Sequence, residues 1–382
     1  MYNVIKQIVF LLLITTLTAC SSFFDKDNTP EPSPLPQFKP SITPTRLWSS
    51  THAGFGSGSE HLRIGPALGN KAIFIASTNG TVTSIDKTNG NKNWQVRTGI
   101  DISTSPGVGN NLVVVGSQQG EVLALSQQDG QKRWKVTLSG AILAKPAINQ
   151  DKVLLKTVNG EIKALSAQDG HELWSFQQTE PNLILRGGSS PLILENSAII
   201  GFANGNLIRL NLQNGQIIWT VLIATPTGAF AISRMVDIDA DPILFEHQIY
   251  AATYQGKIAS LDFRQGTIKW SYKISSYTGM AADTDAVYIS DAKSNLWAFD
   301  AKTGSVKWRQ TKLKARLITG PVLIGNYVVV GDQQGFLHWL DKRTGLFAAH
   351  DYIGAMSAAP LVQDNVLYTL TNSGYLVAYT LN

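Results

Sequence analysis

The stretch GEVLALSQQDGQKRW, residues 120–134, contains the repeat that determines the fold. A glycine starts an alternating apolar run, a second glycine follows ten positions later, and a tryptophan stands four positions after that. The same spacing occurs in five copies, which begin at Gly80, Gly120, Gly160, Gly205 and Gly256 and reach Trp94, Trp134, Trp174, Trp219 and Trp270. Two altered copies follow, in which Ser294 replaces the first glycine and Ala349 replaces the tryptophan. An eighth copy begins at Gly374 and has no tryptophan strand.

Each copy predicts four short strands. In the second copy, apolar or alternating runs cover residues 103–108, 112–117, 121–126 and 132–138, with turn residues between them. Four strands in about 40 residues is the period of a β-propeller blade. Helical repeats of similar period are disfavoured, because the runs are short, rich in valine and isoleucine, and interrupted by glycine.

The two ends of the repeat region complement each other. The eighth copy has three runs, at residues 356–362, 366–371 and 375–380, whereas residues 45–50 carry an unpartnered Trp48 ahead of the first full copy. Closing the ring with this strand removes the free sheet edges. The sequence therefore predicts an all-β, eight-bladed β-propeller of four-stranded blades over residues 45–382, with an N-terminal strand that completes the last blade.

The first 44 residues have a different character. Lys6 and the apolar run after it are typical of a signal peptide over residues 1–19, and LTAC at residues 17–20 resembles the lipobox of bacterial lipoproteins. That resemblance implies acylation of Cys20, and Ser21 in place of an aspartate implies anchoring to the outer membrane, facing the periplasm. Residues 20–44 contain six prolines, so we expect a lipidated cysteine followed by an extended tether.

The sequence shows no catalytic or metal-binding motif. Its six histidines are scattered without zinc-ligand spacing, and no nucleophile elbow or phosphate-binding loop is present. A net charge of +5 without a basic block makes nucleic acid a poor partner. We therefore expect no enzymatic activity, no cofactor and no metal.

The glycine–tryptophan turns resemble the tryptophan-docking motifs of the quinoprotein propeller family, most closely in AFDAKTGSVKW at residues 298–308. That family's dehydrogenases carry a vicinal cysteine pair over their quinone, and Cys20 is the only cysteine here. A quinone-dependent dehydrogenase-like propeller stays open as an alternative, as does a propeller that binds cell-wall polysaccharide.

Two consecutive connections between blades are longer than the regular ones. The distance from a tryptophan to the proline of the next first strand is 12 residues in two copies, but 17 from Trp174 to Pro191 and 23 from Trp219 to Pro242. Both insertions join an outer strand to the next inner strand, so they are expected side by side on one face. Because binding sites concentrate in loops on rigid frames, this face is the predicted functional surface. A third long connection, from Trp48 to Pro66, is glycine-rich at residues 54–58 and is predicted to be flexible.

The inserted segments LILRGGSSP (residues 183–191) and SRMVDIDADP (residues 233–242), with the lipobox and the tether, resemble the BamB family. These are lipoprotein subunits of the outer-membrane β-barrel assembly (BAM) complex. The resemblance implies a scaffold that binds the POTRA domains of BamA and aids insertion of β-barrel proteins into the outer membrane. It assigns partner binding to five residues: Leu183, Leu185, Arg186, Asp237 and Asp239.

A structural role for the same residues is an alternative. Arg186 would then pair with Asp237 or Asp239 across the loops, with both leucines packed beneath. The sequence also leaves open whether nascent outer-membrane proteins contact the propeller.

Overall fold

The computed structural model describes residues 29–52, 62–185 and 187–381. By its contacts the chain divides into two units, Met1–Pro32 and Ser33–Asn382. In the first unit only residues 29–32 are described, and they have no regular secondary structure. The second unit contains all the strands described below. No helix among the described residues is long and apolar enough to cross a membrane.

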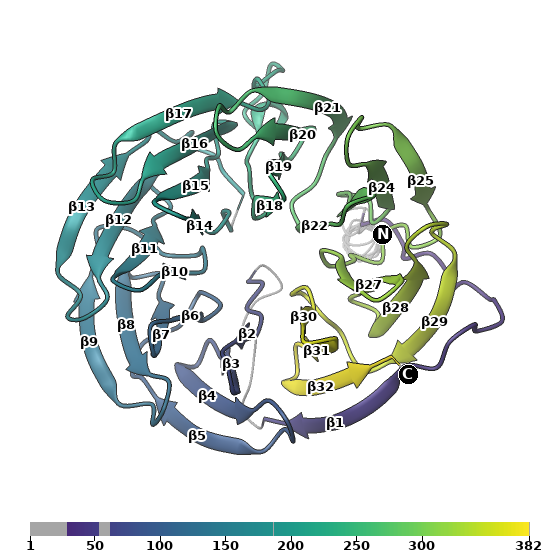
Figure 1. Cartoon of the computed structure of the whole chain (residues 1–382), viewed down its shortest axis with the longest axis horizontal. Helices are drawn as coiled ribbons and strands as arrows, with labels where there is room; N and C mark the ends of the chain where they lie inside the picture. Colours follow the sequence, from purple (N-terminus) through teal and green to yellow (C-terminus); the bar gives the residue numbers. More distant parts are fainter. Residues whose placement is uncertain (1–28, 53–61, 186, 382) are drawn as a thin grey trace, which may run out of the picture. The chain divides into compact units, whose positions relative to one another are not determined.

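The second unit is a ring of eight four-stranded antiparallel sheets, in agreement with the predicted propeller (Figure 1). Blade one contains β2 (Ala67–Leu68), β3 (Ala72–Ala76), β4 (Thr81–Asp86) and β5 (Lys92–Arg97). Blade two contains β6 (Gly107–Gly109), β7 (Leu112–Gly116), β8 (Glu121–Ser126) and β9 (Lys132–Thr137). Blade three contains β10 (Ala147–Ile148), β11 (Lys152–Lys156), β12 (Glu161–Ser166) and β13 (Glu172–Gln177). Blade four contains β14 (Leu192–Leu194), β15 (Ser197–Gly201), β16 (Asn206–Asn211) and β17 (Ile217–Leu222).

The second half of the ring repeats this order. Blade five contains β18 (Ile243–Phe245), β19 (Gln248–Ala252), β20 (Gly256–Asp262) and β21 (Ile268–Ile274). Blade six contains β22 (Met280–Ala282), β23 (Ala286–Ser290), β24 (Leu296–Asp300) and β25 (Val306–Gln310). Blade seven contains β26 (Val322–Ile324), β27 (Tyr327–Gly331), β28 (Phe336–Asp341) and β29 (Phe347–Tyr352). Blade eight contains β30 (Leu361–Gln363), β31 (Val366–Leu370), β32 (Tyr375–Thr380) and β1 (Thr45–Thr51). A single 3₁₀ turn, η1 (Ile232–Arg234), lies between blades four and five.

The pairing of β1 with β32 closes the ring as predicted. Thr45 is opposite Thr380 and Thr51 is opposite Tyr375, so the first and last strands pair along their length, with one bulge between Arg46 and Trp48 (Figure 1). The indole N–H of Trp48 donates to the carbonyl of Lys87 in blade one at 3.2 Å. The N-terminal strand therefore joins the last blade to the first.

Tryptophans on the outer strands pack against the next blade. Trp94 of blade one lies against the turn of blade two, where a Cβ on Gly130 would come within 2.8 Å of the indole. Gly130 has a φ of +72°, so this position needs glycine both for its backbone and for the close approach. The Trp94 indole N–H also donates to the carbonyl of Gln127 at 2.9 Å. The core thus lies between neighbouring blades, and these tryptophans have a structural role.

Two departures from the repeat have structural reasons. Ser294 adopts a φ of +65° in place of the glycine, and its hydroxyl accepts a hydrogen bond of 2.9 Å from the backbone N–H of Leu317. Ala349 stands where a tryptophan would dock on the turn between the third and fourth strands of the next blade. In blade eight these strands are β32 and β1, which no turn connects.

Residues 33–44, which we call the strap, belong to the same unit as the ring. The backbone N–H of Ser41 donates to the carbonyl of Ala348 on β29 at 2.9 Å, and Phe38 stacks on Phe347 with ring centroids 5.5 Å apart. The unit that contains the ring therefore includes the strap, whereas the sequence placed the start of the propeller at residue 45 and assigned these residues to the tether. The physical reason is that β29 carries small side chains where other blades carry tryptophan, and the strap covers this edge.

A buried polar cluster in blade seven also contacts the strap. Arg316 Nε and His338 Nε2 both lie close to Asp332 Oδ2, at 2.6 and 2.8 Å. Arg316 Nη1 donates to the carbonyl of Ser33 at 2.9 Å. The strap is thus held by the stacking of Phe38 on Phe347 and by a hydrogen bond from Arg316, whose charge is paired with that of Asp332.

Candidate functional site

The two long connections lie next to each other and are joined by three aspartates. The first connection covers residues 178–191, between β13 and β14, and the second covers residues 223–242, between β17 and β18. The three acceptors are Oδ1 atoms of Asp237, Asp239 and Asp241, and the donors are the backbone N–H groups of Leu185, Gly188 and Ser190. The first and third of these bonds measure 2.7 and 2.6 Å. Alternate residues of an extended chain point to the same side, which is why an aspartate at every second position can bind one neighbouring segment.

These hydrogen bonds also require a glycine in the first connection. A Cβ on Gly187 would lie 2.5 Å from Oδ1 of Asp239, closer than side-chain atoms approach. Gly188 has a φ of +100°, a conformation that other residues rarely adopt. The glycine pair in the first connection therefore allows the close contact with the second.

The structure separates the predicted site residues into a buried and an exposed group. Asp237 and Asp239 are only 4% and 7% exposed. Leu183 is 41% exposed, and Leu185 is half-buried. Arg186 and the predicted lipidation site Cys20 lie outside the described residues. The aspartates therefore lie beneath the surface and position the first connection, and Leu183 reaches solvent.

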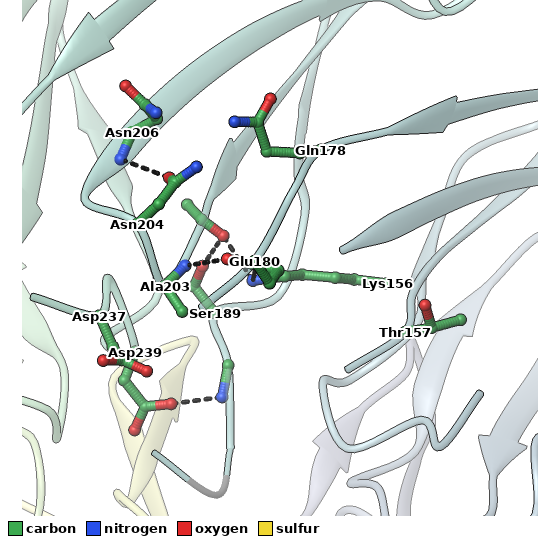
Figure 2. Close-up of polar contacts among 12 residues, drawn as sticks. Lys156, Thr157, Gln178, Glu180, Ser189, Ala203, Asn204, Asn206, Asp237 and Asp239 are labelled. Atoms are coloured by element: carbon green, nitrogen blue, oxygen red, sulfur yellow. Dashed lines mark hydrogen bonds and ion pairs between the residues drawn. The ribbon is translucent and has the colours of Figure 1, made fainter. Parts of the chain in front are cut away.

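A buried lysine and a buried glutamate, which sequence reasoning did not identify as site residues, pair where the first connection begins (Figure 2). Lys156 ends β11, and its Nζ donates to the carbonyl of Gly201 at 2.5 Å and lies 4.0 Å from Glu180 Oε1. Glu180 Oε2 accepts a hydrogen bond of 2.9 Å from the backbone N–H of Ala203. The Lys156–Glu180 pair thus links blades three and four.

Burial perturbs the titration of this cluster. Loss of solvent raises the pKa of Asp237 to about 6, and the negative charge of Asp239 adds to that effect, whereas the hydrogen bond from Leu185 opposes it. Burial also raises the pKa of Glu180 and lowers the pKa of Lys156. Asp237 Oδ2 is buried without a hydrogen-bond partner among the described residues. Together these groups line a cavity of about 20 Å³.

Arg63, from the connection between blades eight and one, reaches Asp239. Its Nη1 lies 3.5 Å from Asp239 Oδ2, and its guanidinium stacks over the ring of Tyr277 at 4.6 Å. The sequence predicted only flexibility for this connection, whose residues 54–58 lie outside the described residues. Arg63 nevertheless gives it a defined contact with the loop pair.

An open cavity of about 590 Å³ adjoins the first connection. Ile184 and Leu185 line one side of it, and Tyr254, Tyr277 and Leu317 line others. In the described part of the chain no group of three or more histidine, cysteine or acidic side chains could hold a metal ion. The lining combines aromatic and aliphatic side chains with polar ones such as Arg63 and Gln333, which suits contact with a protein.

Within the two connections, the most exposed apolar side chains belong to the second. Phe230 is 77% exposed and Ile232 is 67% exposed, at η1. The turn is held by a hydrogen bond of 2.9 Å from Arg234 Nε to the carbonyl of Gly228. Large apolar groups held at a loop tip are typical of a protein interface. The sequence singled out this segment by its length but not these two residues.

Comparison with known proteins gives one consistent family. A family model described as outer membrane protein assembly factor BamB matches residues 78–310. The chain is 41% identical to a protein of that name from Legionella pneumophila, over 96% of this chain and 97% of the relative. It is 45% identical to the one from Alkalilimnicola ehrlichii, over 98% and 97%.

Solved structures show the same fold. The crystal structure of BamB from Moraxella catarrhalis superposes with a TM-score of 0.82 at 28% identity, covering 89% of this chain and all of that one (100%). A quinohemoprotein alcohol dehydrogenase from Comamonas testosteroni reaches a TM-score of 0.69 at 14% identity, covering 88% of this chain and 76% of that one. The second likeness concerns the fold alone.

Proposed function

This chain belongs to the BamB family of outer membrane protein assembly factors, and we propose that it acts as a non-catalytic scaffold within the BAM complex. In this role it binds the POTRA domains of BamA and aids the assembly and insertion of β-barrel proteins into the outer membrane. Cys20 carries the lipid anchor, and the propeller faces the periplasm.

One observation carries the proposal. The two connections that are longer than their counterparts are tied together by three aspartate–backbone hydrogen bonds, and they present apolar side chains to solvent. Loops ordered in this way lose less conformational entropy when a partner binds. The pair is therefore a preorganised binding surface on a rigid ring.

Roles within this surface differ from residue to residue. Leu183 and Leu185, together with Arg186, are the proposed contacts with BamA, because Leu183 is exposed and Leu185 lines the open cavity. Asp237 and Asp239 act by holding the first connection in place, since both are buried. Phe230 and Ile232 extend the apolar surface across the second connection.

The test is capture of BamA from detergent-solubilised outer membranes by tagged full-length variants. Leu183→Ala, Arg186→Ala and Asp237→Ala should each reduce capture, whereas Leu173→Ala should not. Leu173 is a matched control, because it is 41% exposed like Leu183 but lies on the outer strand β13. Undiminished capture by all three variants, each with a native thermal transition, would overturn the assignment of this surface.

Photo-crosslinking in cells from positions 183 and 237 separates two kinds of contact. A crosslink to BamA from position 183 supports the proposed interface. Crosslinks from the same position to nascent β-barrel proteins would instead show that substrates touch this face directly. Because Asp237 is buried, position 237 is expected to crosslink within the chain only.

A further inference from the structure

One connection between blades is strongly basic. From Trp308 to Pro321 the chain contains Arg309, Lys312, Lys314 and Arg316 and no acidic residue. The corresponding connection after Trp219 contains three aspartates against one arginine. The blade six to seven connection therefore differs in charge from its structural equivalent.

Three of these residues are exposed and gather with a lysine from a neighbouring turn. Arg309, Lys312 and Lys314 are exposed, and the backbone N–H of Ala315 donates to the carbonyl of Lys293 at 3.2 Å. Lys293 is also exposed. We call Lys293, Arg309, Lys312 and Lys314 the basic rim.

Nearby acids do not neutralise the basic rim. Within the described ranges none of its four residues forms an ion pair, and Asp332 is already occupied by Arg316 at 2.6 Å. Asp291, next to Lys293 on one turn, accepts hydrogen bonds from the Trp297 indole at 2.9 Å and from Asn295. The rim thus keeps a net positive charge at the surface.

The strap begins at this rim. Ser33 N–H donates to the carbonyl of Lys314 at 3.0 Å, and its hydroxyl donates to the carbonyl of Lys312 at 2.8 Å. Cys20, the predicted acylation site, is 13 positions earlier in the chain. At about 3.3 Å for each residue, a chain of that length reaches roughly 40 Å at most. The rim is therefore the part of the ring where the chain leaves toward its predicted lipid anchor.

We propose that the basic rim binds the anionic phospholipid surface of the membrane that holds the anchor. A lysine near an anionic bilayer strengthens binding by about fivefold, and acyl chains with a polybasic patch form the usual two-part membrane attachment. The rim thus orients the ring, because it places blades six and seven toward the bilayer and leaves blade two away from it. This inference rests on the proposed lipid anchor and not on binding of BamA.

The test uses energy transfer from a fluorophore on the ring to headgroup-labelled lipids. Full-length acylated protein is reconstituted in vesicles of phosphatidylethanolamine with phosphatidylglycerol, or of phosphatidylcholine alone. One reporter is placed at Thr311→Cys beside the rim, and its control is Ser139→Cys on the connection after blade two; both positions are exposed. Mass spectrometry of the protein first establishes its acyl chains.

Transfer from position 311 should exceed transfer from position 139 on phosphatidylglycerol vesicles. The difference should disappear in 0.5 M salt, an ionic strength chosen to screen exposed charges, on phosphatidylcholine, and in the double variant Lys312→Glu/Lys314→Glu. The matched double variant Lys132→Glu/Arg133→Glu on β9 should behave like the parent. Equal transfer from both positions, or transfer unchanged by the rim substitutions, would overturn the proposal.

If mass spectrometry finds no acyl chains, the proposed lipid anchor is contradicted, but binding of the basic rim to lipid can still be tested. Flotation of the unacylated protein with the same anionic vesicles should fall by at least about tenfold in the rim variant and stay unchanged in the β9 variant. If the rim substitutions leave the amount of floated protein unchanged, the proposal is overturned in this case as well. Capture of BamA is measured separately, so failure of one proposal does not obscure the other.

Discussion

The backbone N–H of Leu185 donates a hydrogen bond of 2.7 Å to Oδ1 of Asp237, and this bond joins the first and second long connections of the ring. Asp237→Ala removes the acceptor and should destabilise the protein by about 1–3 kcal/mol, because the donor loses a partner that carries charge. Asp237→Asn keeps an oxygen at the same place and should retain most of the stability. Urea unfolding of both variants measures the difference, and amide exchange at residues 183–190 should rise only in the alanine variant. Equal exchange in the two variants would contradict this role.

The titration of Asp237 predicts a pH dependence of stability. Burial raises the pKa of this carboxyl in the folded protein to about 6, above its ordinary value of 3.8. The protonated form therefore stabilises the fold below about pH 4, and this contribution is lost as the pH rises through about 6. From pH 5 to pH 7.5 the wild type should lose about 1 kcal/mol relative to Asp237→Asn. Chemical denaturation at the two pH values tests this, and a constant difference would show that the carboxyl does not titrate in that range.

The turns that receive the tryptophans should tolerate no side chain. Gly130→Ala introduces a Cβ 2.8 Å from Trp94, and Gly130 has a φ of +72°. Gly99 has nearly the same backbone, with a φ of +77°, but its Cβ would meet nothing within 4 Å. Gly99→Ala should therefore cost about 1 kcal/mol of backbone strain, and Gly130→Ala should cost about 1–3 kcal/mol more. Equal losses in thermal unfolding would mean that tryptophan packing does not require the glycine.

The strap should detach when its aromatic contact is removed. Phe38 stacks on Phe347 and meets the ring of His350 edge-on, with centroids 4.7 Å apart. Phe38→Ala should raise amide exchange at Ser41, whose N–H donates a hydrogen bond to the carbonyl of Ala348. Gln37→Ala, at an exposed position, should leave that exchange unchanged. Hydrogen exchange of the peptide covering residues 37–44 provides the measurement. Unchanged protection would show that the backbone bonds alone hold the strap.

The fold was predictable because its determinants repeat along the sequence. Each tryptophan and its glycine appear at constant spacing, and the lone Trp48 could be matched to the incomplete eighth copy. The loop pair was also found, since an insertion shows as a change in that spacing. These features are local in the chain, so a count of residues detects them.

Other features could not be inferred in this way. The strap looked like a free tether because its prolines exclude regular pairing, yet Phe38 and Phe347 meet across more than 300 positions of the chain. Lys156 occurs at the end of an apolar strand, where its charge gives no hint of the buried Glu180 opposite. The sequence grouped Asp237 and Asp239 with Leu185 as partner-binding residues, but only the structure shows that both aspartates are buried and that Asp237 accepts a hydrogen bond from the Leu185 backbone.

The central claim is that the exposed leucine of the first connection contacts BamA. Isothermal titration of purified POTRA domains into the full-length, detergent-solubilised protein tests it most directly, with Leu183→Ala compared with the equally exposed Leu173→Ala. Leu183→Ala should weaken binding by about tenfold or more, because this exposed apolar side chain becomes buried when BamA binds, whereas Leu173→Ala should leave the affinity unchanged. Wild-type affinity in the Leu183→Ala protein would contradict the central claim.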